Sequence, residues 1–330
     1  MKKVAINGFG RIGRLVLRAY LESEQTDFEI VAINDPGSLE ISAHLLQFDS
    51  VHGTLSESVS HTDNSLSVGS HEFSYTQERD PEQLDWSAQD IDIVFECSGF
   101  FTTREGAEKH LKAGAKKVLI SAPAKGEDIT VVYGVNHDKL KDEHRIVSNA
   151  SCTTNCLAPM AKVMNDAIGI EKGYMTTIHA YTGDQSLVDS MHKDPRRARS
   201  AALSMIPTST GAAKAVGLVL PELMGKLDGS AIRVPTANVS AVDFKFEAKS
   251  DTSVEDLNAL FTEMAYGHLN GVLGVNDKPL VSIDFNHNAN SSVVDLSQTQ
   301  VIDGNFVRVL SWYDNEWGFS NRMLDVAKLM

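Results

Sequence analysis

The sequence predicts an α/β protein with two domains, a doubly wound parallel sheet in the first half and a mostly antiparallel sheet in the second. The chain opens on a short apolar segment, a glycine-rich turn and an amphipathic segment, the pattern of a strand, a tight turn and a helix. Strand-like and helix-like segments alternate as far as residue 150, and period-two strands dominate after it. A chain of 330 residues is long enough for two such domains.

Composition places the chain among folded, acidic proteins. An apolar fraction of 42% supports a real core, and a formal charge of -14 argues against nucleic acid or anionic membranes as partners. Three cysteines are too few for a disulfide framework and fit a reducing compartment. We find no motif with the spacing of a metal site and no apolar run that would span a bilayer. Because the chain enters a strand almost directly after Met1, we expect no signal peptide and a cytoplasmic location.

The first strand is expected over residues 4–6, and three glycines follow it. Gly8, Gly10 and Gly13 have the G-x-G-x-x-G spacing, and a helix-like apolar segment continues from them. The first glycine permits a tight turn, the second lets the backbone approach a pyrophosphate, and the third packs the helix on the strand. The helix N-terminus then holds the anion. By itself this pattern is weak evidence, because glycine-rich turns are common.

A carboxylate after the second strand supports the same site. Residues 28–34 have the pattern of a strand, and Asp35 follows it, 22 residues after Gly13. This is close to the spacing of the acidic residue that binds the ribose in dinucleotide folds. The alternative is a solvated turn residue before Pro36 and Gly37. The two features together favour a dinucleotide site.

The alternation of strands and helices continues to residue 150. Strands are expected over 92–97, 117–121 and 129–133, and a helix over 104–113. This rhythm is typical of a parallel sheet that binds ligands at the carboxyl ends of its strands. Ser98 and Ser121 lie at two such ends, where a serine is often only a cap. Cys97, inside the first of these strands, is expected to be an unreactive core residue.

A polar run around Cys152 carries the strongest chemical signal. Residues 145–147 indicate a strand end, residues 157–164 have helical spacing, and small hydroxylated residues lie between them. Cys152 is therefore expected at a helix N-terminus, where the macrodipole favours a thiolate. A half-buried structural cysteine is the alternative, although a plain core has no need of so many Ser, Thr and Asn residues. Cys156 lies on the same helical face, but two thiols alone do not make a zinc site.

Beyond Cys152, one histidine and one basic segment are candidates for function. Residues 175–182 alternate as a strand does and contain His179, which is either functional or a hydrogen-bonded structural residue. Residues 183–202 show no apolar periodicity, and their basic side chains form either a solvated face or a local anion site. These side chains are His192, Lys193, Arg196, Arg197 and Arg199.

The remaining segments indicate an α+β arrangement. We expect strands over 230–246, 281–285 and 301–311, and helices over 212–223, 255–267 and 319–330. The first of these helices contains Pro221, where we expect an interruption. The strands are expected to form a mostly antiparallel sheet.

Four motifs together resemble the phosphorylating glyceraldehyde-3-phosphate dehydrogenase family. They lie at residues 7–14, 148–159, 179–182 and 312–318, and the run from Ser151 to Cys156 is highly specific. The resemblance covers essentially the whole chain. It implies a Rossmann domain over 1–150 and 315–330, a catalytic α+β domain over 151–314, and a homotetramer.

The resemblance also implies a reaction and a catalytic pair. The reaction is oxidation of glyceraldehyde 3-phosphate to 1,3-bisphosphoglycerate with NAD and inorganic phosphate. Cys152 would attack the aldehyde to give a thiohemiacetal, and a neutral His179 would take the hydroxyl proton as hydride leaves. Phosphate would then attack the resulting thioester. The backbone N–H of Cys152, at a helix start, is a candidate oxyanion donor.

Contacts to the cofactor and to phosphate follow from the same resemblance. Besides Gly8, Gly10 and Gly13, it implies cofactor contacts from Arg11, Ile12, Asp35, Arg79, Ser121 and Asn315. It implies that Thr182 and Arg233 hold the substrate phosphate. The attacking phosphate is held by, or shared among, Ser151, Thr153, Arg197, Thr210 and Gly211. Hydroxyl, backbone amide and guanidinium groups all suit phosphate.

Two departures from the family concern the cofactor. Ser190 and Met191 stand where many NAD-dependent members have Leu-Pro, and Pro36 stands where they have leucine. Asp35 repels a 2′-phosphate and favours NAD, whereas the more polar Ser190 relaxes that preference, so use of NADP stays open.

Two other functions remain as alternatives. Residues 279–287 partly resemble erythrose-4-phosphate dehydrogenase, a relative without phosphorolysis. Against it, residues 182–184 and 210–211 resemble the two anion sites of the phosphorylating enzyme. The second alternative is a non-catalytic binding protein that keeps only the nucleotide fold, which an intact Cys152 and His179 disfavour.

Overall fold

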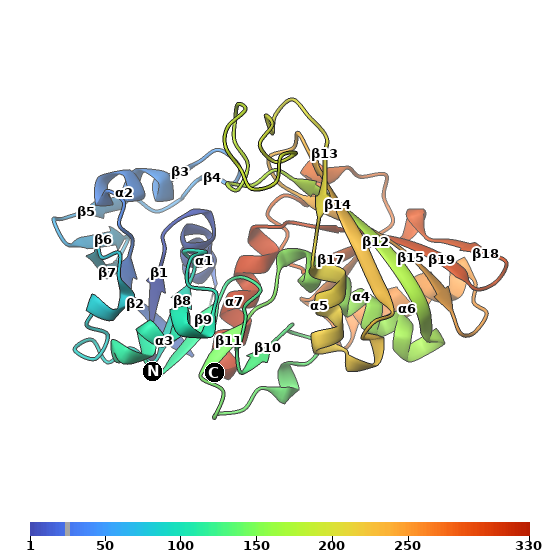
Figure 1. Cartoon of the computed structure of the whole chain (residues 1–330), viewed down its shortest axis with the longest axis horizontal. Coiled ribbons are helices and arrows are strands. Elements are labelled where there is room, and N and C mark those ends of the chain that lie inside the picture. Colours follow the sequence, from blue (N-terminus) through green and yellow to red (C-terminus); the bar gives the residue numbers. More distant parts are fainter. Residues whose placement is uncertain (24–26) are drawn as a thin grey trace. The chain divides into compact units, whose positions relative to one another are not determined.

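The computed structural model describes residues 1–23 and 27–330, and these form two compact units (Figure 1). Unit 1 comprises Met1–Val131, His137–Ser151 and Ser320–Met330. Unit 2 comprises Val132–Asn136 and Cys152–Phe319. Each unit contains one large sheet.

Unit 1 is built around a sheet whose centre is parallel. In the described part of the chain it has nine strands in the order β10-β11-β9-β8-β1-β2-β7-β6-β5. Neighbours from β10 to β7 are parallel, and β6 and β5 are added antiparallel at one edge. The strands are β1 (Lys2–Asn7), β2 (Phe28–Asn34), β5 (Val59–His61), β6 (Ser65–Val68), β7 (His71–Thr76), β8 (Ile93–Glu96), β9 (Lys117–Ile120), β10 (Ile129–Thr130) and β11 (Ile146–Ser148). The expected parallel sheet is confirmed.

Burial explains why the central strand β1 carries an apolar run rather than an alternating pattern. Val4, Ala5 and Ile6 of β1 are all 0% exposed, so the strand is covered on both faces, as in other parallel sheets. The connecting helices are α1 (Arg11–Glu22), α2 (Leu39–Gln47) and α3 (Arg104–Lys112). A short hairpin, β3 (Phe48–Asp49) and β4 (Gly53–Thr54), follows α2.

Unit 2 contains a mostly antiparallel sheet, as expected. Its order is β13-β14-β12-β15-β19-β17-β16, with β18 paired to β19. The β12–β14 and β16–β17 pairs are parallel, and the other pairs of this sheet are antiparallel. The strands are β12 (Ile170–Ala180), β13 (Ile206–Ser209), β14 (Leu227–Val234), β15 (Ser240–Ala248), β16 (Leu273–Asn276), β17 (Ser292–Asp295), β18 (Gln300–Ile302) and β19 (Phe306–Tyr313).

Helix α4 (Cys152–Ile168) packs on this sheet between α5 (Ala212–Val219) and α6 (Val254–Tyr266). Side chains of β15 alternate between buried and half-buried, as expected of a strand with one face toward the core. Val242, Phe244 and Phe246 are buried, and Asp243 and Lys245 are half-buried. Helix α7 (Trp317–Leu329) ends the chain, and its residues from Ser320 onward belong to unit 1. No helix in residues 1–23 or 27–330 is long and apolar enough to cross a bilayer.

The expected strand over 281–285 is wrong, because Ser282–Phe285 forms a short 3-10 helix. Val281, Ile283 and Phe285 alternate as in a strand, yet Val281 and Ile283 are exposed and Phe285 is buried. Asp284 decides the local structure, since its carboxylate accepts a hydrogen bond from the Val281 N–H at 2.9 Å and closes the turn.

Two other expected strands are each a pair of strands. The stretch 230–246 contains the end of β14, a turn and most of β15, and the stretch 301–311 is a hairpin of β18 and β19. Asp303 and Gly304 both have positive φ and form that hairpin's turn. The helix expected over 212–223 ends at Val219, and a 3-10 turn starts at Pro221, which has no N–H to continue the helix.

Candidate active site

The glycine-rich turn after β1 has the geometry of a phosphate loop. Gly8 has a φ of +91°, and a Cβ on it would lie 2.4 Å from the backbone nitrogen of Ser98. A Cβ on Gly13 would lie 2.1 Å from the Gly8 carbonyl oxygen, so α1 packs directly on the turn. A Cβ on Gly10 would meet none of the described residues beyond its own chain neighbours within 4 Å, and α1 starts there without a side-chain cap. An open helix N-terminus of this kind fits a pyrophosphate.

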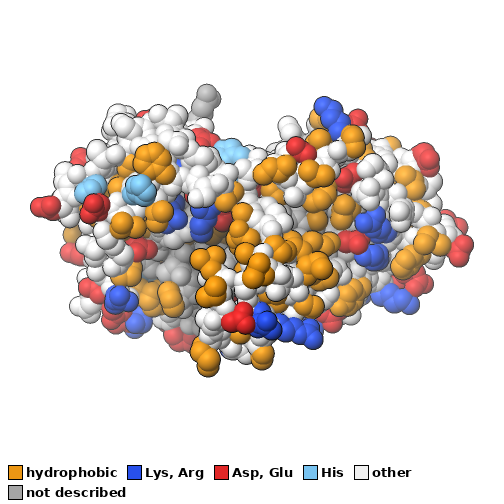
Figure 2. All heavy atoms as spheres, turned by 90° about the horizontal axis from the view of Figure 1, so that it is seen from above, with side chains coloured by type: hydrophobic (Ala, Val, Ile, Leu, Met, Phe, Trp, Pro, Cys, Tyr) orange, Lys and Arg blue, Asp and Glu red, His pale blue; other side chains and the backbone are white. Residues whose placement is uncertain are grey.

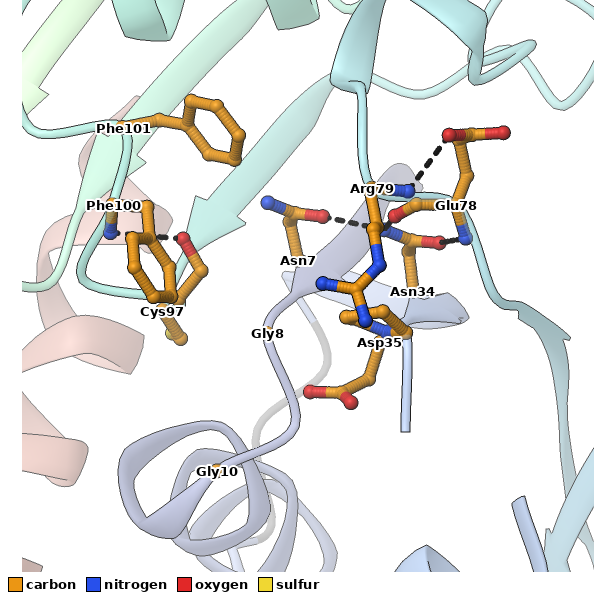
Figure 3. Close-up of a pocket in the computed structure, with 12 residues that line it drawn as sticks. Asn7, Gly8, Gly10, Asn34, Asp35, Glu78, Arg79, Cys97, Phe100 and Phe101 are labelled. Carbon is orange, nitrogen blue, oxygen red and sulfur yellow. Dashed lines mark hydrogen bonds between the residues drawn. The ribbon is translucent and has the colours of Figure 1, made fainter. Parts of the chain in front are cut away.

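A cavity of about 440 Å³ lies beside this turn, at the carboxyl ends of β1, β2 and β8 (Figure 3). Asp35 follows β2 and lines it, and its two carboxylate oxygens accept hydrogen bonds from the N–H groups of Phe9 and Gly37, both at 2.7 Å. Arg79 lines the same cavity, and its side chain extends beside Asp35 in Figure 3. The cavity therefore presents an oriented carboxylate and a guanidinium, which suit a ribose and a phosphate.

The guanidinium of Arg11 has another role in this structure. It forms an ion pair with Asp49, whose side chain is 4% exposed. Burial opposes ionisation of Asp49, but the N–H groups of His52 and Val51 and the Arg11 guanidinium outweigh it and lower the pKa of Asp49 to about 2. Arg11 thus joins the start of α1 to the β3–β4 hairpin.

Asp49→Asn should lower the free energy of unfolding by about 1 kcal/mol at pH 7, allowing for solvent screening of Arg11. Because the folded-state pKa is about 2 and the ordinary value is 3.8, this contribution is present above pH 3.8 and disappears as the pH falls toward 2. Urea unfolding at pH 7 and pH 3 checks it. Asp63→Asn, at an exposed turn, should change little at either pH. A difference that grows on acidification would contradict this assignment.

Three other residues expected near the cofactor lie at separate places. Ile12 is half-buried in the first turn of α1. Ser121 follows β9, and its N–H donates to the Glu96 carbonyl at 3.0 Å. Asn315 belongs to unit 2, where its buried side-chain oxygen accepts a hydrogen bond from the Ser240 hydroxyl at 2.8 Å.

The position expected for Cys97 is wrong. Strand β8 ends at Glu96, and Cys97 lines the cavity instead of lying in the core of the strand. Burial, with a smaller contribution from the Glu96 carboxylate, raises the pKa of the Cys97 thiol to about 12. The thiol is therefore expected to be unreactive because it does not ionise.

In unit 2, Cys152 is the first residue of α4, as expected. Ala150, two residues earlier, is buried and has a φ of +57°, an uncommon conformation for a non-glycine residue. The Thr153 hydroxyl pairs with the Tyr313 hydroxyl at 2.9 Å, and the Thr154 hydroxyl donates to the Ala212 carbonyl at 3.4 Å. The first turn of α4 is thus fixed against β19 and against the start of α5.

The Cys152 Sγ atom lies 3.5 Å from Nε2 of His179. The other ring nitrogen, Nδ1, lies 2.7 Å from the Ala180 carbonyl oxygen, which can only accept a hydrogen bond. Arg233 Nη1, which can only donate, also lies 2.9 Å from Nδ1, but its two protons have acceptors in the Ala180 carbonyl and the Thr182 hydroxyl. We therefore assign the Nδ1 proton to the shorter contact with the Ala180 carbonyl, which leaves a lone pair on Nε2 facing the thiol. The pair has the arrangement of a nucleophile and its base.

The electrostatics of this pair differ from the expected thiolate. Burial raises the pKa of Cys152, and the Arg233 charge and the hydrogen bonds at the helix start only partly offset this. Burial and then the Arg233 charge lower the pKa of His179 to about 3. The resting pair is thus a thiol and a neutral imidazole, because removal from water disfavours both charged forms.

The pairing of two strands places Arg233 beside Cys152 and His179. Strands β12 and β14 are parallel neighbours, and Arg233 is the register partner of His179. Its Nη1 lies 2.9 Å from His179 Nδ1, donates to the Ala180 carbonyl at 2.9 Å and donates to the Thr182 hydroxyl at 3.4 Å. The structure thus brings together Cys152, His179, Thr182 and Arg233.

Of the other expected phosphate residues, Arg197, Thr210 and Gly211 lie in unit 2, beside strand β13 and the start of α5. Arg197 forms an ion pair with Asp184 at 2.7 Å, and its Nε donates to the Thr208 hydroxyl at 3.0 Å. The Thr210 hydroxyl accepts a hydrogen bond from the Ala212 N–H at 3.2 Å, and Gly211 is the N-cap of α5. Ser151 and Thr153 flank the nucleophile in the chain.

Two side chains of this site lie within the motifs at residues 182–184 and 312–318, but the sequence assigned neither of them a role of its own. Tyr313 is buried, its hydroxyl bonds both Thr153 and Thr177 at 2.9 Å, and its ring packs edge-on to His179. Asp184 holds Arg197. The motifs do not show what these side chains contact, because each contact depends on how the packed chain brings separate residues together.

Comparison with known proteins finds one family over nearly the whole chain. The family model "Glyceraldehyde 3-phosphate dehydrogenase, NAD binding domain" matches residues 2–104, and the corresponding C-terminal domain model matches residues 151–315. The chain belongs to the glyceraldehyde 3-phosphate dehydrogenase family. It is thus an NAD-dependent dehydrogenase, and the expected family, enzyme class and cofactor are confirmed.

Several curated relatives carry the same name. Glyceraldehyde-3-phosphate dehydrogenase of Xanthobacter flavus is 64% identical over 99% of this chain and 98% of its own length. That of Cereibacter sphaeroides is 61% identical over 99% of this chain and 98% of its own length. Glyceraldehyde-3-phosphate dehydrogenase 1 of Bacillus subtilis (strain 168) is 57% identical over 98% of this chain and 97% of its own length.

Proposed function

We propose that this chain oxidises glyceraldehyde 3-phosphate with NAD and traps the product with inorganic phosphate as 1,3-bisphosphoglycerate. The observation that carries the proposal is the pair of Cys152 Sγ and His179 Nε2, 3.5 Å apart, with the lone pair of Nε2 toward the thiol. A soft sulfur nucleophile suits an aldehyde carbon, and a neutral imidazole suits the two proton transfers.

The reaction proceeds in two stages. In the first, Sγ adds to the aldehyde carbon, and His179 Nε2 takes the thiol proton and delivers it to the carbonyl oxygen. His179 takes that proton back as the thiohemiacetal is oxidised to a thioester, a step for which NAD, when bound, would supply the hydride acceptor. In the second stage a phosphate oxygen attacks the thioester carbon and the carbon–sulfur bond breaks, so that Cys152 leaves as the sulfur anion and takes the proton held on His179 Nε2. The N–H of Cys152, at the start of α4, is placed to donate to the developing oxyanion.

Two groups of donors are proposed for the two phosphates. Arg233 and Thr182, beside the catalytic pair, hold the phosphate of the substrate. The attacking phosphate is held by, or shared among, Ser151, Thr153, Arg197, Thr210 and Gly211. Arg197 can offer a forked guanidinium there, although it must share its donors with Asp184.

For the cofactor, we propose contacts from the turn of Gly8, Gly10 and Gly13, and from Asp35 and Arg79. The open N-terminus of α1 suits the pyrophosphate, and the oriented Asp35 carboxylate suits the ribose hydroxyls. Further contacts are proposed from Ile12, Ser121 and Asn315, and from the backbone of Arg11, whose guanidinium is paired with Asp49.

An assay with and without phosphate tests the proposal. With glyceraldehyde 3-phosphate and NAD, reduced cofactor should form continuously when phosphate is present. Without phosphate it should form as a burst of about one equivalent per chain, because the thioester is not released. Continuous turnover of erythrose 4-phosphate that is indifferent to phosphate would favour the non-phosphorylating alternative. No turnover with either sugar phosphate would favour a non-catalytic binding protein.

Cofactor preference is the second testable consequence. A 2′-phosphate near Asp35 meets like charge, so kcat/KM should favour NAD over NADP by at least about tenfold. The Arg79 guanidinium lines the same cavity and offsets part of the repulsion between Asp35 and the 2′-phosphate of NADP. Asp35→Asn keeps an oxygen for the Phe9 N–H while removing the charge, and should narrow the gap mainly by improving NADP binding. A gap untouched by this substitution would assign the preference to residues 183–202 instead.

We also propose a homotetramer in the cytoplasm, with unit 1 as the dinucleotide-binding domain and unit 2 as the catalytic domain. Segment 183–205 supports assembly, because it exposes several large apolar side chains, namely Leu187, Val188, Met191, Leu203 and Met205. Figure 2 shows hydrophobic side chains gathered on the face that carries this segment. Light scattering after size-exclusion chromatography should give four times the 36.0 kDa mass of one chain. A monomeric mass at micromolar concentration would contradict the proposal.

A further inference from the structure

We propose that a buried series of hydrogen-bonded polar side chains beneath the cavity of unit 1 holds the cavity wall in the shape that binds the dinucleotide. His110 belongs to this series and is a positioning residue for NAD binding. The chain of contacts runs across the carboxyl ends of β8, β1, β2 and β7, which are consecutive neighbours in the sheet. The inference rests on the proposed use of this cavity by NAD.

Glu96 is the centre of the chain. Its carboxylate is 1% exposed, and Oε2 accepts hydrogen bonds from Asn7 Nδ2 at 2.6 Å and from His110 Nε2 at 2.9 Å. Oε1 accepts from the N–H of Ser98 at 2.8 Å and from the Ser98 hydroxyl. Four donors around one buried carboxylate leave it little freedom to move.

The direction of the His110 hydrogen bond is determined by a tryptophan. Trp86 Nε1–H, which can only donate, lies 3.2 Å from His110 Nδ1. Nδ1 must therefore accept, and in the neutral ring the proton resides on Nε2, where it donates to Glu96. Trp86 and His110 are both 0% exposed, so water does not replace either contact in this structure.

From Glu96 the chain continues away from His110 through two asparagines. Asn7 Oδ1 accepts from Asn34 Nδ2 at 2.7 Å. Asn34 Oδ1 in turn accepts from the Thr76 hydroxyl at 2.8 Å and from the Glu78 N–H at 2.9 Å. Both asparagines are at most 3% exposed, and the amide orientations follow from these partners.

Three residues of this chain of contacts, Asn7, Asn34 and Glu78, line the cavity (Figure 3). Ser98 also lines it and approaches Gly8 so closely that a Cβ on Gly8 would lie 2.4 Å from the Ser98 nitrogen. Phe101, another lining residue, packs edge-on to His110 with ring centroids 6.1 Å apart. Loss of the His110 donor therefore leaves Glu96 short of a partner and lets it shift Asn7 and Ser98, which shape the cavity.

Two substitutions at one position separate positioning from general stability. His110→Gln keeps an N–H donor for Glu96, whereas His110→Leu fills similar space without one. By isothermal titration calorimetry of the full chain, His110→Leu should raise the Kd for NAD by at least about tenfold, and His110→Gln by less than about threefold. Neither should change the alkylation rate of Cys152 measured without NAD, because that thiol belongs to unit 2.

A folded His110→Leu variant with the Kd of the unmodified chain would overturn the inference, and so would equal losses in both variants. If the unmodified chain failed to bind NAD, the proposed cofactor site itself would fail as well. Should His110→Leu not fold, Trp86→Phe provides the second test, because it frees His110 Nδ1 to take the proton. Trp86→Phe should raise the Kd for NAD about threefold or more, and an unchanged Kd would overturn the inference.

Discussion

Substitution of Cys152 by serine should abolish oxidation, lowering kcat/KM by about four orders of magnitude or more. A hydroxyl is a harder and far less acidic nucleophile than a thiol. Serine therefore passes its proton to the neutral His179 imidazole far less readily than the Cys152 thiol does, and its oxygen is a poorer nucleophile for this reaction. Turnover measured from reduced cofactor, at saturating NAD and phosphate, gives the comparison.

Cys156→Ser is the matched control on the same helix. Cys156 is buried, its thiol donates to the Ser292 hydroxyl at 3.7 Å, and burial raises its pKa to about 12. A serine there can keep the hydrogen bond, so most activity should remain. In unmodified protein, iodoacetamide should label Cys152 first, with loss of activity in proportion. Early labelling of Cys97 or Cys156 with full turnover retained would refute the assignment.

Local patterns predicted those parts of the fold that depend on neighbouring residues. The turn at Gly8 and Gly13, the carboxylate of Asp35 and the helix start at Cys152 all lie where the spacing indicated. Each is decided within a few residues by backbone sterics, a strand end or a helix N-terminus. The same kind of argument wrongly predicted a strand over residues 281–285. There the Asp284 side chain closes a turn, and the apolar Val281 and Ile283 are exposed to solvent.

Contacts between distant segments were beyond such patterns. Arg233 meets His179 because two strands pair in one register, and a shift by one residue would turn that side chain to the other face of the sheet.

The acidity of Cys152 also depends on more than its local sequence. A helix N-terminus favours the thiolate, and the hydrogen bonds of the helix start do lower the pKa, but burial outweighs them. Burial depends on how the whole unit packs, so a short motif does not predict it.

His179→Asn should lower kcat by about two to four orders of magnitude. Asparagine has no basic nitrogen in the place of the imidazole Nε2, so neither the Cys152 thiol nor the thiohemiacetal hydroxyl has a base to accept its proton. Alkylation of Cys152 at neutral pH should slow for the same reason. His268→Asn, at an exposed position after α6, should leave both rates unchanged.

The pH dependence of stability provides an independent check on His179. Its pKa is lowered from 6.5 to about 3 in the folded chain, so between these values the unfolded chain binds a proton that the folded chain does not. Stability should therefore fall as the pH drops below 6.5, by up to about 1.4 kcal/mol per pH unit from this residue. His179→Asn removes that contribution, so urea midpoints of the variant should change less between pH 7 and pH 5. Equal pH dependence, together with unchanged turnover and unchanged alkylation, would remove His179 from the mechanism.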